Sequence, residues 1–390
     1  MAKIMFHGVG SNIPTGYGRQ TKLFTPALQN AGFEVTINAI LDQYATGLDS
    51  NGIINLASGP RQGMLGNDFF AEHANRLKPD IVLSMVDPFT CKPELFDKTN
   101  WFPWVMVHGE PLLWENKEVL KACVKPIAPT PHAKKVLIDA GFDPYYCPLA
   151  VDTEVFKPID RQEARKAVSE VWDTPIDKDT FIVVANAANH SRPSRKNFGA
   201  MFKAWGLFQK EHNAENCVLY IHTEREGELY SGENLKRYEE LYGDKGIVYA
   251  PQYEYCCGTL PESYLTACYN AADVYLCTST GEGFGLPIVE AQACGCPVIA
   301  PNFGSMADNV FTGSLVSGQM FNSWEVGSEC FLVDNNDIAG TLCKYNAGVR
   351  GDVSSAVIAS LVSQFDIKAV TENHLLPMLK DIVENQILMS

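Results

Sequence analysis

The 390-residue sequence has no apolar run of the roughly 18 to 20 residues that a membrane-spanning helix needs. The opening residues, Met1 to Phe6, lead into polar residues too soon for a secretory signal peptide. Hydrophobic residues make up 46% of the chain and charged residues 20%, which excludes a disordered or fibrous protein. We therefore expect a soluble, cytoplasmic protein of two or three domains, with no stable membrane insertion.

Positive charge is scarce, because 31 Lys and Arg residues stand against 46 Asp and Glu residues, a formal net charge of −15. A general nucleic-acid binder needs a positive face to gain from counterion release. Residues 1–150 carry 13 basic and 14 acidic side chains, and residues 151–390 carry 18 and 32. The charge therefore excludes the second half as a nucleic-acid binder, whereas an anionic partner could still bind the near-neutral first half.

Metal-binding patterns are also missing. The twelve cysteines include no C-x-x-C pair, and most of them stand in apolar runs, so we expect buried, reduced thiols. The only D-x-D, Asp177-Lys178-Asp179, lies in a polar stretch and not at a strand end, and we interpret it as a solvated turn. The sequence therefore predicts no metal site and no cofactor.

Short β-branched runs alternate with longer stretches of helical period, which predicts an α/β fold with parallel sheets. Two sets of strands are separated by a junction at 148–160 and a polar helix after it, and the stretch 368–387 predicts a helix that starts or kinks near Pro377. The expected strands are 3–9, 34–40, 80–85, 103–107 and 124–128, then 181–185, 217–222, 246–249, 273–277 and 297–300.

The most informative stretch runs from Thr278 to Ala300. After an expected strand comes a loop, Gly281-Glu282-Gly283-Phe284-Gly285-Leu286-Pro287, and then a helix that Gly295 closes, with Glu290 on its first turn. Glycines let backbone N–H groups approach a ligand, and a helix N-terminus favours a phosphate or a polar sugar. The two glutamates can therefore address two parts of one ligand.

This stretch closely resembles the Glu-x7-Glu signature of retaining glycosyltransferases of the GT-B fold, specifically family 4, the glycosyl transferases group 1. Similar stretches cover nearly the whole chain. The resemblance implies two Rossmann-like domains whose parallel sheets face each other across a cleft. The implied parts are an acceptor-side domain (1–155), a donor-binding domain (156–365) and a C-terminal helix that returns to the first domain (366–390). It also implies that Glu282 faces the transferred sugar and that Glu290 holds the nucleotide ribose, with Gly283, Phe284, Gly285 and Leu286 in the donor loop.

A second chemical element, residues 185–198, follows an expected strand and precedes an amphipathic helix. Its cations, Arg192, Arg195 and Lys196, stand where a diphosphate leaving group would develop charge. The family has an Arg and a Lys here that contact the pyrophosphate. Lys196 matches the lysine, and we favour Arg192 over Arg195 as the arginine. The competing interpretation is a solvated basic turn.

The first domain contributes two further candidates. The loop 8–20 resembles the glycine-rich loop that lies under the donor phosphates in this family, which assigns Gly16 and Gly18 to donor binding; a simple strand-to-helix turn is the alternative. His108 is expected at a strand end, where the family has a histidine that contacts the sugar. We therefore group His108 with Glu282, Arg192 and Lys196 as catalytic candidates.

The sequence thus predicts metal-independent, retaining transfer of a sugar from a nucleotide-diphosphate sugar to an acceptor hydroxyl. A GT-B nucleotide-sugar epimerase and a non-catalytic nucleotide-sugar or glycan-binding protein are the alternatives. A soluble saccharide, a small molecule, a protein side chain and a hydroxylated nucleobase all remain open as acceptors. Residues 308 and 221–223 depart from the family pattern, so the nucleobase is open too.

Overall fold

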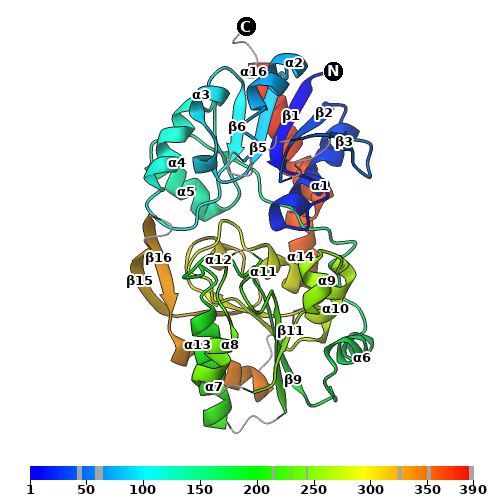
Figure 1. Cartoon of the computed structure of the whole chain (residues 1–390), viewed down its shortest axis with the longest axis vertical. Coiled ribbons are helices and arrows are strands. Elements are labelled where there is room, and N and C mark those ends of the chain that lie inside the picture. The colour runs from blue at the N-terminus through cyan, green and yellow to red at the C-terminus, as the bar shows by residue number, and fades with distance from the viewer. Residues whose placement is uncertain are drawn as a thin grey trace. The chain divides into compact units, whose positions relative to one another are not determined.

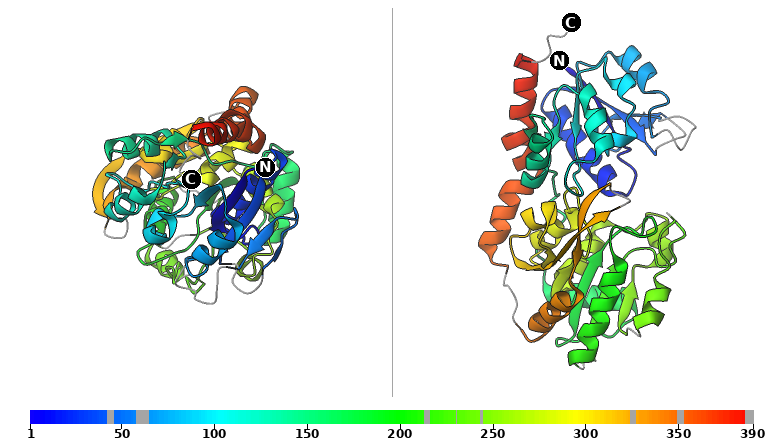
Figure 2. Two further views of the ribbon diagram at one scale, coloured as in Figure 1. Left: turned by 90° about the horizontal axis from the view of Figure 1, so that it is seen from above. Right: turned by 90° about the vertical axis from the view of Figure 1, so that its left-hand side faces the viewer.

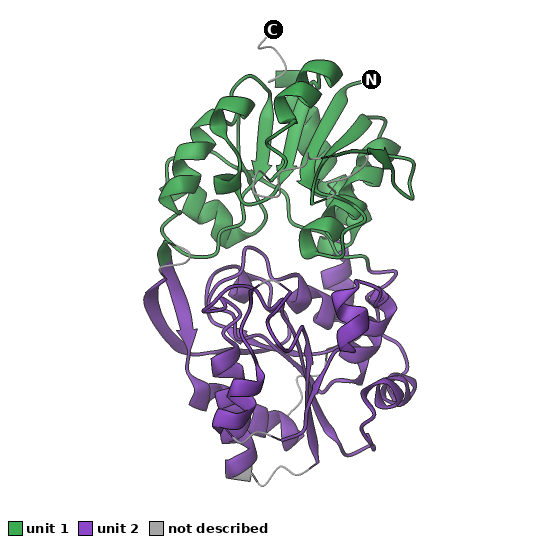
Figure 3. Cartoon of the chain, in the orientation of Figure 1, with its two compact units in different colours: residues 1–152, 324–328, 364–390 green, residues 153–323, 329–363 purple. Residues whose placement is uncertain are grey.

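The computed structural model describes residues 1–41, 46–57, 65–212, 216–229, 231–242, 245–323, 327–348 and 353–385. The chain divides into two compact units, coloured separately in Figure 3. Unit 1 comprises Met1–Asp152, Trp324–Ser328 and Gln364–Ser390, and unit 2 comprises Thr153–Ser323 and Glu329–Ser363. Each unit has its own largely parallel sheet, and this confirms the predicted α/β class (Figure 1).

The sheet of unit 1 has the strand order β3-β4-β2-β1-β5-β6-β7-β8 and is parallel except for the β3–β4 pair. Six successive residues of β1 and of β2 are buried, so helices must cover both faces of the sheet (Figure 2). The strands are β1 Lys3–Val9, β2 Glu34–Ile40, β3 Gly47–Leu48, β4 Ile54–Leu56, β5 Ile81–Met85, β6 Trp101–Trp104, β7 Ile127–Ala128 and β8 Tyr145–Tyr146. The helices before the crossing to unit 2 are α1 Gly16–Asn30, α2 Phe70–Leu77, α3 Pro93–Phe96, α4 Trp114–Val119 and α5 Pro131–Asp139, with 3₁₀ turns at Pro88–Thr90 and Leu120–Ala122.

The C-terminal segment packs on unit 1. It consists of α15 (Ile367–Val370), a π-helical turn (Thr371–Leu375) and α16 (Leu376–Asn385). Pro377 has no backbone N–H to donate, and the wider π turn comes directly before it, where a start or kink was predicted. The hydroxyl of Tyr145 on β8 donates to Asp381 of α16, which attaches the last helix to the edge of the sheet.

The segment that leaves unit 1 is tied to the segment that returns. The backbone N–H of Val151 donates to the carbonyl of Phe365 at 2.8 Å. Next to it, the side-chain amide of Gln20 on α1 both donates to and accepts from the backbone of Ala150, at 2.8 and 2.9 Å. One buried glutamine therefore fixes the end of the outgoing segment against α1.

The sheet of unit 2 is parallel throughout, in the order β11-β10-β9-β12-β13-β14, and a separate two-stranded ladder joins β15 to β16. Its strands are β9 Phe181–Asn186, β10 Cys217–His222, β11 Ile247–Tyr249, β12 Val274–Leu276, β13 Val298–Pro301, β14 Gly313–Val316, β15 Gly318–Ser323 and β16 Ser328–Val333. Its helices are α6 Arg161–Trp172, α7 Phe198–His212, α8 Lys236–Tyr242, α9 Gln252–Cys256, α10 Glu262–Ala271, α11 Leu286–Ala293, α12 Gly304–Asp308, α13 Asn335–Asn346 and α14 Ser355–Phe365. Across the described ranges, no helix combines the length and apolarity needed to cross a membrane.

The predicted strands 3–9, 34–40 and 217–222 are present with those bounds. The prediction of a strand over 103–107 was wrong in position, because β6 is Trp101–Trp104 and ends opposite Met85, the last residue of its partner β5. The apolar run continues to Val107, beyond the last residue of β6 that pairs with β5. Apolarity alone therefore did not show where the strand ends. Strands β3, β4, β8 and β14 to β16 were not predicted.

The twelve cysteines are all free thiols, and most are buried, as predicted. Burial raises the pKa of Cys91 and of Cys268 to about 12, so these thiols stay protonated at neutral pH. Cys123 and Cys343 are half-buried, and Cys256 and Cys257, at the end of α9, are exposed.

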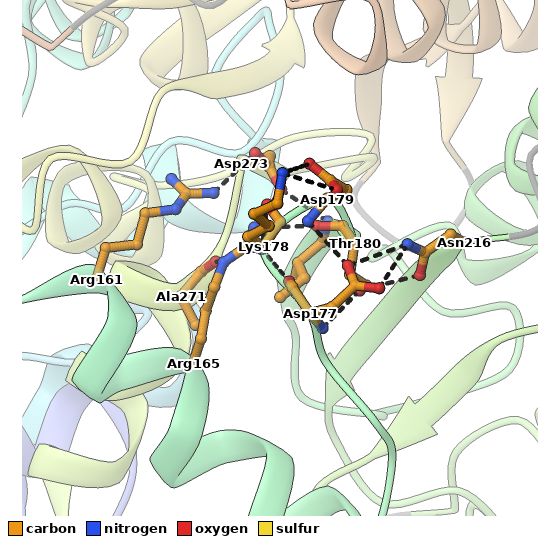
Figure 4. Close-up of polar contacts among 10 residues, drawn as sticks. Arg161, Arg165, Asp177, Lys178, Asp179, Thr180, Asn216, Ala271 and Asp273 are labelled. Carbon is orange, nitrogen blue, oxygen red and sulfur yellow. Dashed lines mark hydrogen bonds and ion pairs between the residues drawn. The ribbon is translucent and has the colours of Figure 1, made fainter.

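A buried carboxylate, Asp273, joins several elements at the amino ends of β9 and β12 (Figure 4). It accepts hydrogen bonds from Arg161 and Arg165 of α6, at 2.7 and 3.0 Å, and from the backbone N–H of Ile182 at 2.9 Å. Arg165 also donates to the carbonyls of Ala271, Asp177, Lys178 and Thr180. The buried Arg165 guanidinium is therefore paired with the Asp273 carboxylate and hydrogen-bonded to backbone carbonyls.

Replacing Arg165 with Ala is expected to lower the free energy of unfolding by about 3 to 5 kcal/mol, because it leaves a fully buried carboxylate short of one cation. Urea unfolding followed by circular dichroism measures the change. Lys178→Ala is the control, since the Lys178 side chain is 87% exposed and no measurable change is expected. An Arg165→Ala midpoint equal to that of the unmodified protein would contradict the stabilising role of this ion pair.

Candidate functional site

A glycine-rich loop connects β12 to α11 in unit 2. Gly285 has φ +86° and stands directly before α11, a backbone conformation that glycine adopts without strain. Leu286 is the first residue of α11 and Pro287 the second. Phe284 is buried, and the side-chain amide of Asn309 donates to its carbonyl at 2.7 Å. The predicted strand–loop–helix motif is therefore present, and its loop is held in one shape.

The loop is also bonded to the residues that follow β9. The Thr278 hydroxyl donates to the carbonyl of Lys196 at 2.9 Å, and the N–H of Thr280 donates to the carbonyl of Arg195 at 2.9 Å. These bonds join two segments that lie some 80 residues apart in sequence. They bring the two chemical elements found in the sequence into one site.

Glu282 lies between two cations. Its Oε1 is 2.6 Å from Nζ of Lys196, and its Oε2 is 3.0 Å from Nη1 of Arg195. Burial on its own would raise the pKa of Glu282. The attraction of Arg195 and Lys196, with hydrogen bonds from Lys196 and Ser279, outweighs burial and holds this pKa well below its usual range. Glu282 is therefore ionised at neutral pH.

The two arginines of the basic loop have different surroundings. Arg195 reaches Glu282 and also donates to the carbonyl of Gly281. Arg192 instead donates to the carbonyls of Gly232 and Gly227, in the loop before α8. The structure thus places Arg195 with Lys196 at Glu282 and places Arg192 in a separate loop contact. Nearby, burial first and then Lys196 and Arg195 lower the pKa of His190, which is therefore neutral at pH 7.

A cavity opens at the carboxyl ends of β9 and β12. Its lining includes Asn186, Lys196, Tyr275, Ser279, Glu282 and Pro287. In parallel α/β sheets, this end of the strands is where ligands bind. The cavity therefore combines two opposite charges, an amide and the first turn of a helix.

Glu290 is 3% exposed on α11, and its Oε2 accepts a hydrogen bond from the hydroxyl of Tyr269 at 3.2 Å. It is the fifth residue of that helix, one residue later than a start at Pro287 would place it, so it lies just beyond the expected first turn. The helix begins at Leu286, before the proline that was taken as its first residue. Sequence reasoning did not identify Tyr269, because it belongs to α10.

Gly16 and Gly18 lie in unit 1, at the start of α1. The Thr15 hydroxyl accepts the N–H of Gly18 at 3.0 Å and caps the helix. A Cβ on Gly18 would lie 2.1 Å from the carbonyl oxygen of Ile13. Packing alone therefore requires glycine at position 18, whether or not a ligand approaches it.

His108 is also in unit 1. It lies four residues beyond the end of β6, and its Nε2 is 3.4 Å from Oδ1 of Asp87, which follows β5. Sequence analysis missed Asp87, although it follows an apolar strand just as His108 does. Unit 1 thus holds Gly16, Gly18 and His108, and unit 2 holds all the other predicted site residues.

The D-x-D stretch forms a turn near the amino end of β9 (Figure 4). Oδ1 of Asp177 accepts from the backbone of Asp179 at 2.8 Å and from the Thr180 hydroxyl at 3.0 Å. A hydrogen bond from Asn216, followed by these two, lowers the pKa of Asp177. Among the residues that the structure describes, no group of three or more His, Cys, Asp or Glu side chains is arranged to hold a metal ion.

Residues 180–339 match the family model described as Glycosyl transferases group 1. This range contains every predicted site residue of unit 2. D-inositol 3-phosphate glycosyltransferase of Mycobacterium bovis (strain BCG / Pasteur 1173P2) is 29% identical over 249 residues, which are 62% of this chain and 45% of that protein. The matched region thus spans less than half the length of this curated relative.

Two solved structures share the fold over nearly the whole chain. Sucrose-phosphate synthase from Thermosynechococcus elongatus has a TM-score of 0.77 at 17% identity, covering 98% of this chain and 100% of that one. An E. coli structure described as trehalose-6-phosphate bound with UDP-2-fluoro glucose has a TM-score of 0.61 at 12% identity, covering both chains fully. The predicted GT-B fold is confirmed, and so is the resemblance to glycosyl transferases group 1.

Gly18→Ala is expected to lower the free energy of unfolding by about 1 to 3 kcal/mol, because the new methyl group overlaps the carbonyl of Ile13. Chemical unfolding followed by circular dichroism measures the change. The matched control is Gly47→Ala, since nothing lies within 4 Å of a Cβ built on Gly47. Equal stability of the two variants would show that the close approach at Gly18 does not constrain the loop.

Proposed function

We propose that this chain is a retaining, metal-independent glycosyltransferase that moves a sugar from a nucleotide-diphosphate sugar to an acceptor hydroxyl. The observation that carries the proposal is the ionised Glu282 beside Lys196 and Arg195, in a cavity at the carboxyl ends of β9 and β12. The match of residues 180–339 to glycosyl transferases group 1 supports it. A cytoplasmic location is part of the same proposal.

In this proposal, Lys196 and Arg195 bind the diphosphate of the donor. Their positive charges stabilise the negative charge that develops as the sugar departs, and the N-terminus of α11 adds its partial positive charge. These groups would do what a divalent metal does in other transferases. The geometry favours Arg195 as the partner of Lys196, which was the second choice after Arg192 in the sequence analysis.

The transfer itself would occur on one face of the sugar. The acceptor oxygen bonds to the anomeric carbon on the side from which the diphosphate leaves, so the configuration is retained. The acceptor proton passes to the departing phosphate oxygen. Glu282 would bind the hydroxyls of the transferred sugar, because an ionised carboxylate only accepts hydrogen bonds. Glu290 would bind the nucleotide ribose.

Unit 1 would supply the acceptor side, with His108 contacting the sugar and the loop at Gly16 and Gly18 near the donor phosphates. The acceptor stays open among soluble saccharides, small molecules, protein side chains and hydroxylated nucleobases. The mycobacterial relative is described as a D-inositol 3-phosphate glycosyltransferase. Inositol phosphates therefore belong in the first acceptor panel.

The test is incubation of the full chain with UDP-, GDP- and ADP-sugars, with and without candidate acceptors, followed by measurement of released nucleotide and of new sugar products. Nucleotide release is expected to depend on an acceptor. EDTA at about 5 mM, which exceeds any trace metal, is expected to leave the rate of release unchanged. Epimer formation without an acceptor would establish the epimerase instead. Binding without turnover on any donor would establish a binding protein.

Glu282→Gln, Lys196→Ala and Arg195→Ala are each expected to lower kcat at least about 100-fold, because each removes a charge that faces the reacting groups. Steady-state nucleotide release on the best donor measures the loss. Lys203→Ala is the control, since Lys203 is an exposed lysine on α7, and it is expected to keep full activity.

Arg192→Ala separates the two arginines. If Arg195 is the partner of Lys196, Arg192→Ala keeps far more activity than Arg195→Ala, because the hydrogen bonds described for Arg192 go to the carbonyls of Gly227 and Gly232. The reverse order would return the diphosphate role to Arg192. Full activity of Glu282→Gln or Lys196→Ala would contradict the site as a whole.

A further inference from the structure

Three side chains from three elements of unit 2 form a chain of hydrogen bonds behind the candidate site. Nδ2 of Asn186, the last residue of β9, donates to the hydroxyl oxygen of Tyr269 on α10 at 3.0 Å. That hydroxyl donates to Oε2 of Glu290 on α11 at 3.2 Å. The three residues are called the Asn186–Tyr269–Glu290 relay below.

The relay has one direction. A tyrosine hydroxyl has a single proton, and an amide N–H that points at its oxygen requires that proton to point elsewhere. Oε2 of Glu290 lies 3.2 Å from the hydroxyl oxygen and accepts that proton. Asn186 and Glu290 together therefore make Tyr269 a donor to Glu290.

Packing holds the relay in place. Tyr269 is fully buried, and its ring contacts those of Phe156 and Tyr275, with centroids 6.2 and 5.9 Å away. The Tyr275 hydroxyl donates to the backbone carbonyl of Asn186 at 3.2 Å, which fixes the strand end that carries the amide. Packing therefore holds the Tyr269 ring, and the bond from Tyr275 holds the backbone of Asn186.

The relay also joins two regions of the site. Asn186 lines the cavity that contains Lys196 and Glu282, whereas Tyr269 and Glu290 are buried on the helices beside it. A carboxylate offers about four lone-pair positions, so one carboxylate can accept hydrogen bonds both from a tyrosine and from hydroxyls of a ligand. In dinucleotide-binding α/β folds, an acidic residue accepts a hydrogen bond from a ribose hydroxyl.

We propose that Asn186 and Tyr269 are positioning residues that fix the Glu290 carboxylate in the orientation that binds the ribose hydroxyls of the nucleotide. This inference rests on the proposed function, in which Glu290 holds the ribose. Its specific content is that ribose recognition depends on two residues that need not touch the ribose. The relay lets the site distinguish a ribonucleotide from a deoxyribonucleotide.

The test compares the Kd values of UDP, GDP and ADP with those of their 2′-deoxy and 3′-deoxy forms, by calorimetry on the full chain. The readout is the deoxy-to-ribo ratio of Kd for the tightest-binding nucleotide. Both nucleotides of a pair carry the same diphosphate, so a change in cavity charge cancels in the ratio. The unmodified protein is expected to prefer the ribonucleotide by about tenfold or more.

Three variants probe the relay. Tyr269→Phe removes the hydroxyl and keeps the ring. Asn186→Asp keeps the side-chain shape but replaces the donor with an acceptor, which draws the Tyr269 proton away from Glu290. Glu290→Gln tests the carboxylate itself. All three are expected to bring the ratio to within about threefold of one.

The matched control is Tyr238→Phe. The Tyr238 hydroxyl donates to Oε1 of Glu233 at 3.2 Å, so this variant removes a bond of the same type and length elsewhere in unit 2. Its deoxy-to-ribo ratio is expected to equal that of the unmodified protein. Circular dichroism checks that each variant is folded. If Tyr269→Phe does not fold, Asn186→Asp alone tests the relay.

The outcomes separate the two proposals. If Glu290→Gln loses the discrimination while Tyr269→Phe and Asn186→Asp keep it, the relay is overturned and the ribose role of Glu290 stands. If Glu290→Gln keeps the discrimination, or the unmodified protein shows none, the ribose role fails and the relay fails with it. Loss in the Tyr238→Phe control would also overturn the relay as the cause.

Discussion

The geometry of the candidate site depends on how β9 and β12 are aligned, and one buried carboxylate sets that alignment. Asp273 accepts the N–H of Ile182 on β9 through its side chain, and its own N–H donates to the carbonyl of Ile182 at 2.8 Å. This fixes the register in which Val274 lies opposite Val183. A shift by one residue would move every later side chain to the other face of the sheet. Asn186 and the loop that carries Glu282 are therefore aligned from the opposite end of the two strands.

The net negative charge of the chain affects how this site can bind a diphosphate. A protein of net charge −15 repels a diphosphate at long range, so recognition must come from close contacts. Glu282 keeps Lys196 and Arg195 together by neutralising part of their charge. In the proposed function, a donor diphosphate would compete for the same two cations, and the Glu282 carboxylate would then turn to the sugar. In the same proposal, the ion pair of Glu282 with Lys196 and Arg195 would hold both cations in position for the donor.

Contiguous motifs made part of this site predictable. Glu282, Lys196 and Arg195 stand in two short stretches whose glycines, cations and expected strand–loop–helix order favour binding of a phosphate or a polar sugar. The resemblance to glycosyl transferases group 1 implied their individual roles. The choice between Arg192 and Arg195 could not be made in the same way, because it depends on which side of a loop each side chain occupies. Asn186 and Tyr269 were missed for a related reason. They are 83 residues apart, and only the packing of α10 against β9 brings them together.

The order of the chain through the two units has a consequence for how the molecule is made. Unit 2 is almost one continuous segment, whereas unit 1 needs residues from both ends of the chain. Met378, Leu379 and Ile382 of α16 are buried in unit 1, yet they are synthesised after all of unit 2. During synthesis from the N-terminus, unit 2 has all its residues before unit 1 does. The part of unit 1 that precedes unit 2 in the chain therefore has an incomplete core until α16 has been synthesised, after unit 2.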